Sequence, residues 1–359
     1  MKRLFCFCLC CLFLLSADQL QAGTVVTDDA GRQVEIPDTV HRLVTTFKPA
    51  TLLVLSLDGA ESLVGVDNSS RFDPLSLAAA PELAELPGVG SKSQNINLET
   101  VISLHPDLVI LYSQKTGIQL AERLQNSGCP AVVIAPETFG SIHETLKMLA
   151  RALDREEQAE KVIQAMHEVQ DLTRKRVEDI SQSDRKTVYY AGPSGFLTTA
   201  PSGMLQDVMI RRAGGRNAAS SLYGYFKQVS PEQIMAWAPD SIVLSRMIRP
   251  QAKNMLKRDQ FSLLPAVTNN DIHVFPSTLA PWDFPSPLSA LGVLWLGTRL
   301  YPERFADISL MQKVNDFHQT LFGLSFTKMN GHLDDDLPGE HPVGHTHLPA
   351  GDIDDEHSK

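Results

Sequence analysis

The segment DREEQAEKVIQAMHEVQDLTRKRVEDI, residues 154–180, decides how the rest of the chain is organised. Its apolar residues recur at steps of mostly three or four, the period of one face of an α-helix, while Glu, Gln, Lys and Arg fill the other face. Asp154 followed by Glu157 is close to a capping box and predicts the start of the helix. Because neither Gly nor Pro interrupts the segment, we expect one helix of roughly 40 Å, at about 1.5 Å per residue.

Strands alternate with helices on both sides of this segment, so we interpret it as a strut between two lobes rather than a helix within one domain. Short β-type runs precede it at residues 41–46, 63–66, 107–111 and 131–134, and follow it at 187–190, 241–244 and 273–275. This alternation predicts parallel α/β lobes. A short helix stopped by Pro-Asp precedes an apolar strand in both halves, at Pro106-Asp107 and Pro239-Asp240, which indicates internal duplication. We predict an N-terminal lobe over residues 23–153, a linking helix over 154–183 and a C-terminal lobe over 184–328.

The first 22 of the 359 residues have the layout of a secretory signal peptide. Lys2 and Arg3 precede an apolar run, residues 4–15, that is too short to span a membrane, and we expect cleavage near Ala22. Four of the five cysteines lie in this segment, so Cys129 alone remains, which excludes an intrachain disulfide and a multi-cysteine metal site in the mature chain. We expect a soluble exported protein, with Cys129 buried.

Five motifs follow one another along the two predicted lobes. They are Leu98-Glu99 with Pro106-Asp107-Leu108-Val109, Ala213-Gly214-Gly215-Arg216-Asn217, Val229-Ser230-Pro231-Glu232, Pro239-Asp240, and Ala266-Val267 with His273-Val274-Phe275. In this order and spacing they resemble the periplasmic substrate-binding proteins that serve ABC importers of ferric siderophores, haem and cobalamin. The resemblance covers about residues 42–322.

The resemblance implies an α/β fold of two Rossmann-like lobes joined by one long helix, with the ligand in the cleft between them. It implies a binding protein rather than an enzyme, acting in the periplasm as a monomer without a covalent cofactor. The expected ligand is a metal chelate such as a ferric siderophore, haem or cobalamin. The expected partner is the inner-membrane permease of an ABC importer, with its cytoplasmic ATPase.

Glu99 and Glu232 occupy equivalent points of the two repeats. The resemblance implies that one exposed Glu in each lobe docks onto arginines of the permease. Charged residues at the rim of an interface suit this task, because they set the relative orientation of the two proteins and the rate at which they associate. The structural alternative is that both are early-helix acids favoured by the helix dipole.

The ligand-binding residues are expected in loops at the strand ends that face the cleft. Aromatic side chains there supply flat contact area, and arginines supply forked donors for carboxylate, catecholate or oxyanion groups. The candidates are Phe47, Lys48, Arg71, Tyr112, Tyr225, Phe226, Arg246, Arg249, Trp282 and Asp283. For each of them, local packing or simple solvation is the structural alternative.

The candidate loops hold no His that could ligate a bare metal ion, since His105, His143 and His273 fall in predicted helices or strands. The cationic candidates instead favour a negatively charged ligand. An oxyanion such as molybdate or tungstate is the alternative to a chelate within the same architecture. No G-x-S-x-G or H-E-x-x-H motif is present, and a formal net charge of −10 argues against nucleic acid.

The C-terminal tail, residues 329–359, is rich in His and Asp and poor in apolar residues, so we expect it to be disordered. His341, His345 and His347 are candidates for weak binding of a transition metal, and a solvated acidic tail is the structural alternative. From a different functional class, the whole protein could be a periplasmic metal store or chaperone that works through this tail.

Overall fold

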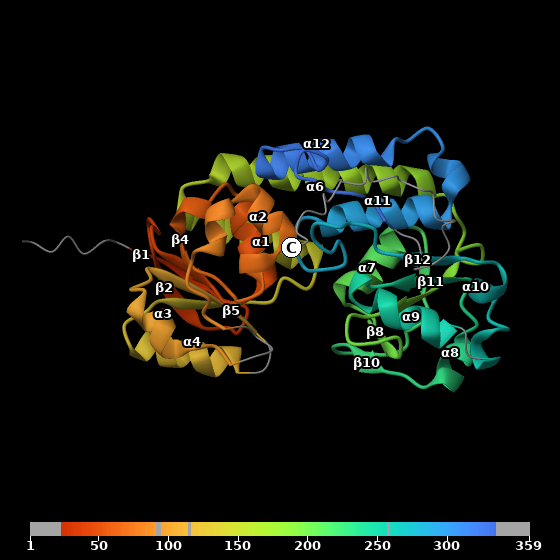
Figure 1. The fold of residues 1–359 in the computed structure, drawn as a ribbon, viewed down its shortest axis with the longest axis horizontal. Helices are drawn as coiled ribbons and strands as arrows, with labels where there is room; N and C mark the ends of the chain where they lie inside the picture. The colour runs from red at the N-terminus through yellow and green to blue at the C-terminus, as the bar shows by residue number, and fades with distance from the viewer. Residues whose placement is uncertain (1–22, 91–94, 114–115, 257–258, 335–359) are drawn as a thin grey trace, which may run out of the picture.

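The computed structural model describes residues 23–90, 95–113, 116–256 and 259–334. Two α/β lobes lie side by side, and long helices run across both of them (Figure 1). The sheet of the first lobe contains β3 (Leu43–Thr45), β4 (Leu63–Gly65), β5 (Leu108–Tyr112) and β6 (Ala131–Ile134). The sheet of the second contains β7 (Thr187–Ala191), β9 (Arg216–Asn217), β11 (Ser241–Leu244) and β12 (Ile272–Val274). The predicted fold class is confirmed.

Both sheets are parallel and have the same strand order. The order is β4-β3-β5-β6 in the first lobe and β9-β7-β11-β12 in the second. In each sheet the second strand in the chain, β4 or β9, forms the edge next to the first strand, β3 or β7. Their central strands are buried on both faces, as expected of parallel sheets covered by helices. The shared order agrees with the internal duplication that the sequence indicates.

The Asp of each repeated Pro-Asp pair follows a helix and hydrogen-bonds the backbone at or just before the first strand of its sheet. A carboxylate oxygen of Asp107 accepts hydrogen bonds from the backbone N–H groups of His41 and Arg42, at 2.9 and 2.8 Å. Asp240 likewise accepts from the N–H of Thr187 at 2.7 Å. Just before each pair the backbone turns through a left-handed residue, His105 (φ 45°) or Ala238 (φ 43°). These turns end α3 (Leu98–Ser103) and α8 (Pro231–Trp237) at corresponding places in the two lobes.

The linking helix is α6 (Glu156–Val177), 22 residues long, or about 33 Å. It is shorter than the predicted span of 154–183, and the predicted capping box at Asp154 is wrong. Asp154 is instead the left-handed C-cap of α5 (Phe139–Leu153), and Arg155 precedes α6 without a side-chain cap. The reason is that α5 and α6 are nearly contiguous, so Asp154 has to turn the chain between them.

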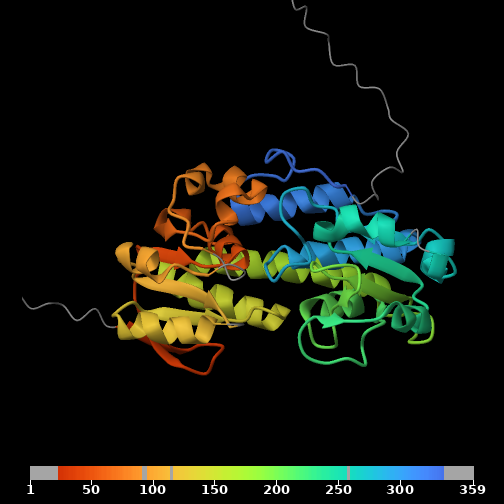
Figure 2. The ribbon, with the colours of Figure 1, turned by 60° about the horizontal axis from the view of Figure 1, so that its bottom comes forward.

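Helix α6 does not join the lobes alone. Helices α11 (Ser289–Leu300) and α12 (Leu310–Phe322) pack along it, and α12 also contacts α1 (Lys48–Ser56) of the first lobe (Figures 1 and 2). The side-chain amide of Gln158 donates to the carbonyl oxygens of Ser56 and Thr320, at 3.2 and 2.9 Å, and so ties α1, α6 and α12 together.

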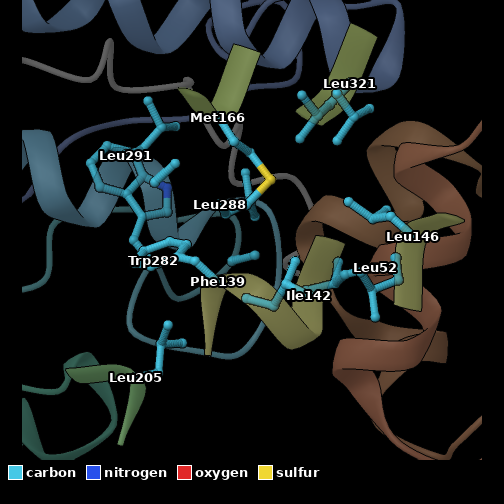
Figure 3. Packing of buried hydrophobic residues seen from close by; sticks show 14 of the residues in the cluster. Leu52, Phe139, Ile142, Leu146, Met166, Leu205, Trp282, Leu288, Leu291 and Leu321 are labelled. Atoms are coloured by element: carbon cyan, nitrogen blue, oxygen red, sulfur yellow. The ribbon is translucent and has the colours of Figure 1, made fainter. Parts of the chain in front are cut away.

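One hydrophobic cluster runs without interruption through both lobes. Leu52 and Leu146 of the first lobe lie beside Leu321 of α12 and Met166 of α6, and Leu291 of the second lobe follows (Figure 3). Each of these side chains is at most 1% exposed. The lobes are therefore halves of one packed unit.

The other elements complete the two lobes. They are the hairpin β1 (Gly23–Thr27) and β2 (Gln33–Pro37), helices α2 (Pro74–Ala79), α4 (Gly117–Asn126), α7 (Leu205–Arg212), α9 (Arg249–Leu256) and α10 (Pro265–Thr268), and the short pair β8 (Thr198–Thr199) and β10 (Lys227–Gln228). Cys129 is buried, as predicted. No helix in the described parts of the chain is long and apolar enough to cross a membrane.

The C-terminal lobe extends further than its predicted end at residue 328. Met329 is buried, and Leu333 forms an antiparallel bridge with Ser277. The prediction of a disordered tail from residue 329 is therefore wrong for residues 329–334, because apolar Met329 and Leu333 provide surface to bury. The rest of the tail, with His341, His345 and His347, lies outside the described residues.

We expect Leu52→Ala, a change in the first lobe, to destabilise both lobes together by about 2–4 kcal/mol, since it opens a cavity in the shared core. The three tryptophans, Trp237, Trp282 and Trp295, all lie in the second lobe and report on its unfolding. Tryptophan fluorescence and far-UV circular dichroism should therefore shift to the same lower urea midpoint. The control is Ile118→Ala on the exposed side of α4. Two separate transitions would show that the lobes unfold independently.

Candidate functional site

The candidate site lies where the carboxyl ends of the strands face the other lobe. In both sheets the chain order reverses between two central strands, β3 and β5 or β7 and β11, and ligands bind outside the carboxyl ends of strands at such points. Phe139 is the first residue of α5, just after β6. The guanidinium carbon of Arg212, on α7 of the second lobe, lies 4.5 Å from the centroid of the Phe139 ring. Phe139 and Trp282, from the loop after β12, belong to the same buried hydrophobic cluster (Figure 3). Residues just after β6 and after β12 therefore pack into the core that the two lobes share.

Phe47 and Tyr112 lie together at the carboxyl ends of β3 and β5. Their ring centroids are 5.0 Å apart, and the hydroxyl of Tyr112 donates to Glu137. Their side chains are only 2% and 4% exposed, so they offer little surface for contact with a ligand.

Lys48 and Arg71 are both engaged within the first lobe. The Lys48 ammonium lies 2.7 Å from the carboxylate of Asp73, which also caps α2 by accepting from the N–H of Ser76. Arg71 donates to the carbonyl oxygen of Ala84 at 3.0 Å and stacks on Phe72, whose side chain is 72% exposed. Phe72 is therefore the more accessible residue of this loop.

Tyr225 and Phe226 differ in exposure within the second lobe. Phe226 is half-buried against Tyr190, with ring centroids 6.4 Å apart, whereas Tyr225 is 52% exposed. Tyr223, in the same loop, is 73% exposed. Tyr223 and Tyr225 are thus the aromatic side chains that this loop presents to solvent.

Trp282 and Asp283 lie inside the second lobe rather than on a ligand-accessible surface, and both are 0% exposed. A carboxylate oxygen of Asp283 accepts from the hydroxyl of Tyr190 at 2.7 Å, and its backbone carbonyl accepts from Gln206 at 2.7 Å. Burial raises the pKa of Asp283, although the Tyr190 hydrogen bond opposes the shift. The prediction of ligand contact is corrected for these two residues: their loop turns inward because the indole of Trp282 joins the shared core.

Arg246 and Arg249 converge on one carboxylate at the carboxyl end of β11. Arg249 donates to one Asp334 oxygen at 2.7 Å and also pairs with the other, and Arg246 lies 3.3 Å from that second oxygen. Arg246 also donates to the backbone carbonyl of Asp334 at 2.8 Å. These two candidate residues therefore lie together, and their role in ligand binding stays a prediction. Their partner Asp334 was missed, because Asp334 lies within residues 329–359, the tail for which composition predicts disorder.

The described residues hold no group of three or more His, Cys, Asp or Glu side chains that could bind a metal ion. His273 lies on β12 with its Nε2 2.9 Å from Asp271, and His105 forms the turn after α3. His143 lies on α5 beside His167, and burial, with the nearby His167 and Arg212, lowers its pKa to about 4. These three His therefore lie on a strand, in a turn and on a helix rather than in the candidate loops.

Glu99 and Glu232 occupy corresponding positions in the first turns of α3 and α8, and both are exposed. The side chains of Asn97 and Ser230 cap these helices in the same way. Helices α3 and α8 lie on the same side of the molecule, near its opposite ends (Figure 1). The two carboxylates are thus carried by equivalent elements on one side, and their docking role stays a prediction.

Residues 43–279 match the model of the periplasmic binding protein family, and the chain belongs to that family. Molybdate-binding protein MolA of Haemophilus influenzae is 26% identical over 344 residues, which cover 89% of this chain and 97% of that protein. A vitamin B12-binding protein of Pectobacterium carotovorum is 25% identical over 204 residues, which cover 57% of this chain and 71% of that protein. The structure of MolA bound to molybdate has a TM-score of 0.75 and 25% identity, and the match covers 84% of this chain and 98% of that one.

These relatives confirm the resemblance that the motifs indicate and define the protein as a substrate-binding protein of an ABC transporter, not an enzyme. They also imply that it is exported, since such proteins act outside the cytoplasm.

We expect Asp283→Asn to leave ligand affinity unchanged and to increase stability, more at pH 8 than at pH 5. Burial raises the pKa of Asp283 in the folded state, so the unfolded state loses this proton first and the wild-type protein loses stability as the pH rises. Asn cannot ionise and escapes this loss. Urea unfolding at the two pH values measures the difference, with Asp316→Asn on the exposed face of α12 as the control. An equal loss of stability at both pH values would show that the carboxylate is needed in its ionised form.

Proposed function

We propose that this protein binds a small oxyanion of the molybdate type and delivers it to the permease of an ABC importer. The observation that carries the proposal is the convergence of Arg246 and Arg249 on a single carboxylate at the carboxyl end of β11. A tetrahedral oxyanion presents pairs of oxygens much as a carboxylate does, and guanidinium forks match such pairs with two parallel hydrogen bonds. The similarity to MolA along almost its whole length supports the same ligand class.

An anionic metal chelate is the second candidate, favoured by a different observation. Phe72 in the first lobe and Tyr223 and Tyr225 in the second are more than half exposed, in loops of the predicted site. Exposed aromatic rings bind flat, partly apolar ligands at low entropic cost. The similarity to vitamin B12-binding proteins agrees with this candidate.

The remaining parts of the proposal concern location and partners. We propose that the signal peptide is removed near Ala22 and that the mature monomer works in the periplasm without a cofactor. Glu99 and Glu232 would contact the permease, which acts with its cytoplasmic ATPase. Metal binding by His341, His345 and His347 stays a separate prediction.

We expect isothermal titration calorimetry of the mature protein to detect molybdate and tungstate binding. Arg246→Gln should weaken it about 10- to 100-fold, because a hydrogen bond to a charged group contributes about 1.5–3 kcal/mol. Arg123→Gln, on the exposed side of α4, is the control. Binding of cobalamin or a ferric siderophore, without any response to oxyanions, would favour the second candidate. Unchanged affinity in Arg246→Gln would remove Arg246 from the site.

We expect the double change Glu99→Arg and Glu232→Arg to abolish uptake in cells that carry the permease while leaving ligand affinity intact. Both carboxylates lie on the protein surface, so reversing their charge disturbs docking rather than folding. Glu122→Arg with Glu303→Arg is the charge-matched control, at exposed positions on α4 and in the second lobe. Loss of ligand affinity in the first variant would place the two carboxylates at the ligand site instead.

A further inference from the structure

The carboxylate that pairs with Arg246 and Arg249 belongs to Asp334, in the last segment that the structure describes. Residues 331–334 follow α12 and lie against residues 276–278, the loop after β12. The N–H of His332 donates to the hydroxyl of Thr278 at 2.8 Å, and the N–H of Asp334 donates to the carbonyl of Pro276 at 2.8 Å. The segment therefore delivers Asp334 to the carboxyl end of the second sheet.

The contacts of Asp334 are those expected of an anionic ligand. Both of its carboxylate oxygens face guanidinium groups, and three hydrogen-bonding contacts to Arg249 and Arg246 hold it there. Burial alone would raise the pKa of Asp334, but the two guanidinium groups outweigh burial and lower it, so the side chain is a carboxylate at neutral pH. The arginine pair is therefore already neutralised in part by this chain's own residue.

The attachment of the segment is slight compared with the core of the lobe. Hydrogen bonds to the 276–278 loop and the contacts of Asp334 with Arg246 and Arg249 hold the segment, and Leu333 is only half-buried. The Asp334 side chain itself is 35% exposed, so solvent screens the ion pairs. Segments held by few buried contacts open at low free-energy cost, without unfolding of the whole domain.

We propose that Asp334 is an internal competitor that holds the anion subsite of Arg246 and Arg249 until the transported ligand displaces it. This proposal rests on the proposed function, because it assumes that the same arginine pair receives the ligand. A tethered carboxylate has a high effective concentration at its subsite, so it lowers the apparent affinity for the ligand. It raises the apparent dissociation constant of every competing anion by the same factor, so an anion that binds weakly needs a higher concentration to occupy the subsite.

We expect Asp334→Asn to bind molybdate on the order of tenfold more tightly than the wild-type mature protein, since the amide no longer competes for the guanidinium groups. Asp259→Asn, which removes an exposed carboxylate elsewhere in the second lobe, should leave the affinity unchanged. Calorimetric titration at one salt concentration measures both.

A second measurement needs no variant. Molybdate added to the wild-type protein should accelerate hydrogen exchange at the amides of His332 and Asp334, because displacement breaks their hydrogen bonds to the 276–278 loop. Tighter binding in Asp334→Asn together with faster exchange supports the proposal. Equal or weaker binding by Asp334→Asn, or slower exchange, overturns it while leaving the oxyanion function standing. If molybdate and tungstate bind to neither the wild type nor the variant, the proposed function and this inference fail together.

Discussion

The packing of α11 and α12 along α6 is the interaction on which the rest of the structure depends. It merges the cores of two α/β lobes, so that Leu52 and Leu146 of one lobe share a cluster with Trp282 and Leu291 of the other. Close-packed interiors transmit displacement rather than absorb it. The two carboxyl edges are therefore held at a fixed spacing, which favours a site that is formed before the ligand arrives.

The sequence allowed the sheets and most helices to be predicted because their signals are local. Apolar runs such as residues 108–111, which follow a Pro-Asp pair, are typical of a buried strand. The two Pro-Asp pairs mark the same helix-to-strand junction in each repeat. The bounds of the linking helix were less accurate, since Asp154 fits a helix start as well as it fits the turn that the structure makes with it. The bridging role of α12 could not be predicted, because it depends on contacts with α1, far away in the chain.

The sequence allowed the positions of the candidate loops to be predicted, but not the burial and the ion pairs of their side chains. Strand ends locate the loops, and Arg246 and Arg249 lie where expected. Burial and ion pairing depend on tertiary partners, however, and these decide what each side chain can do. Lys48 faces Asp73, the arginine pair faces Asp334, and Trp282 turns into the core. Composition also gave no reason to expect Asp334 in the site, because its neighbours in sequence are those of a solvated tail.

The late position of α12 in the chain has a consequence for folding. The surface of α1 that α12 covers belongs to the first lobe, yet α12 is synthesised only after the strands of both lobes. Contacts between such distant segments form slowly, because a long loop must close before they gain free energy. The first lobe thus lacks part of its cover while the chain is still being made. Part of the apolar surface of the first lobe therefore stays accessible until nearly the whole chain has been made.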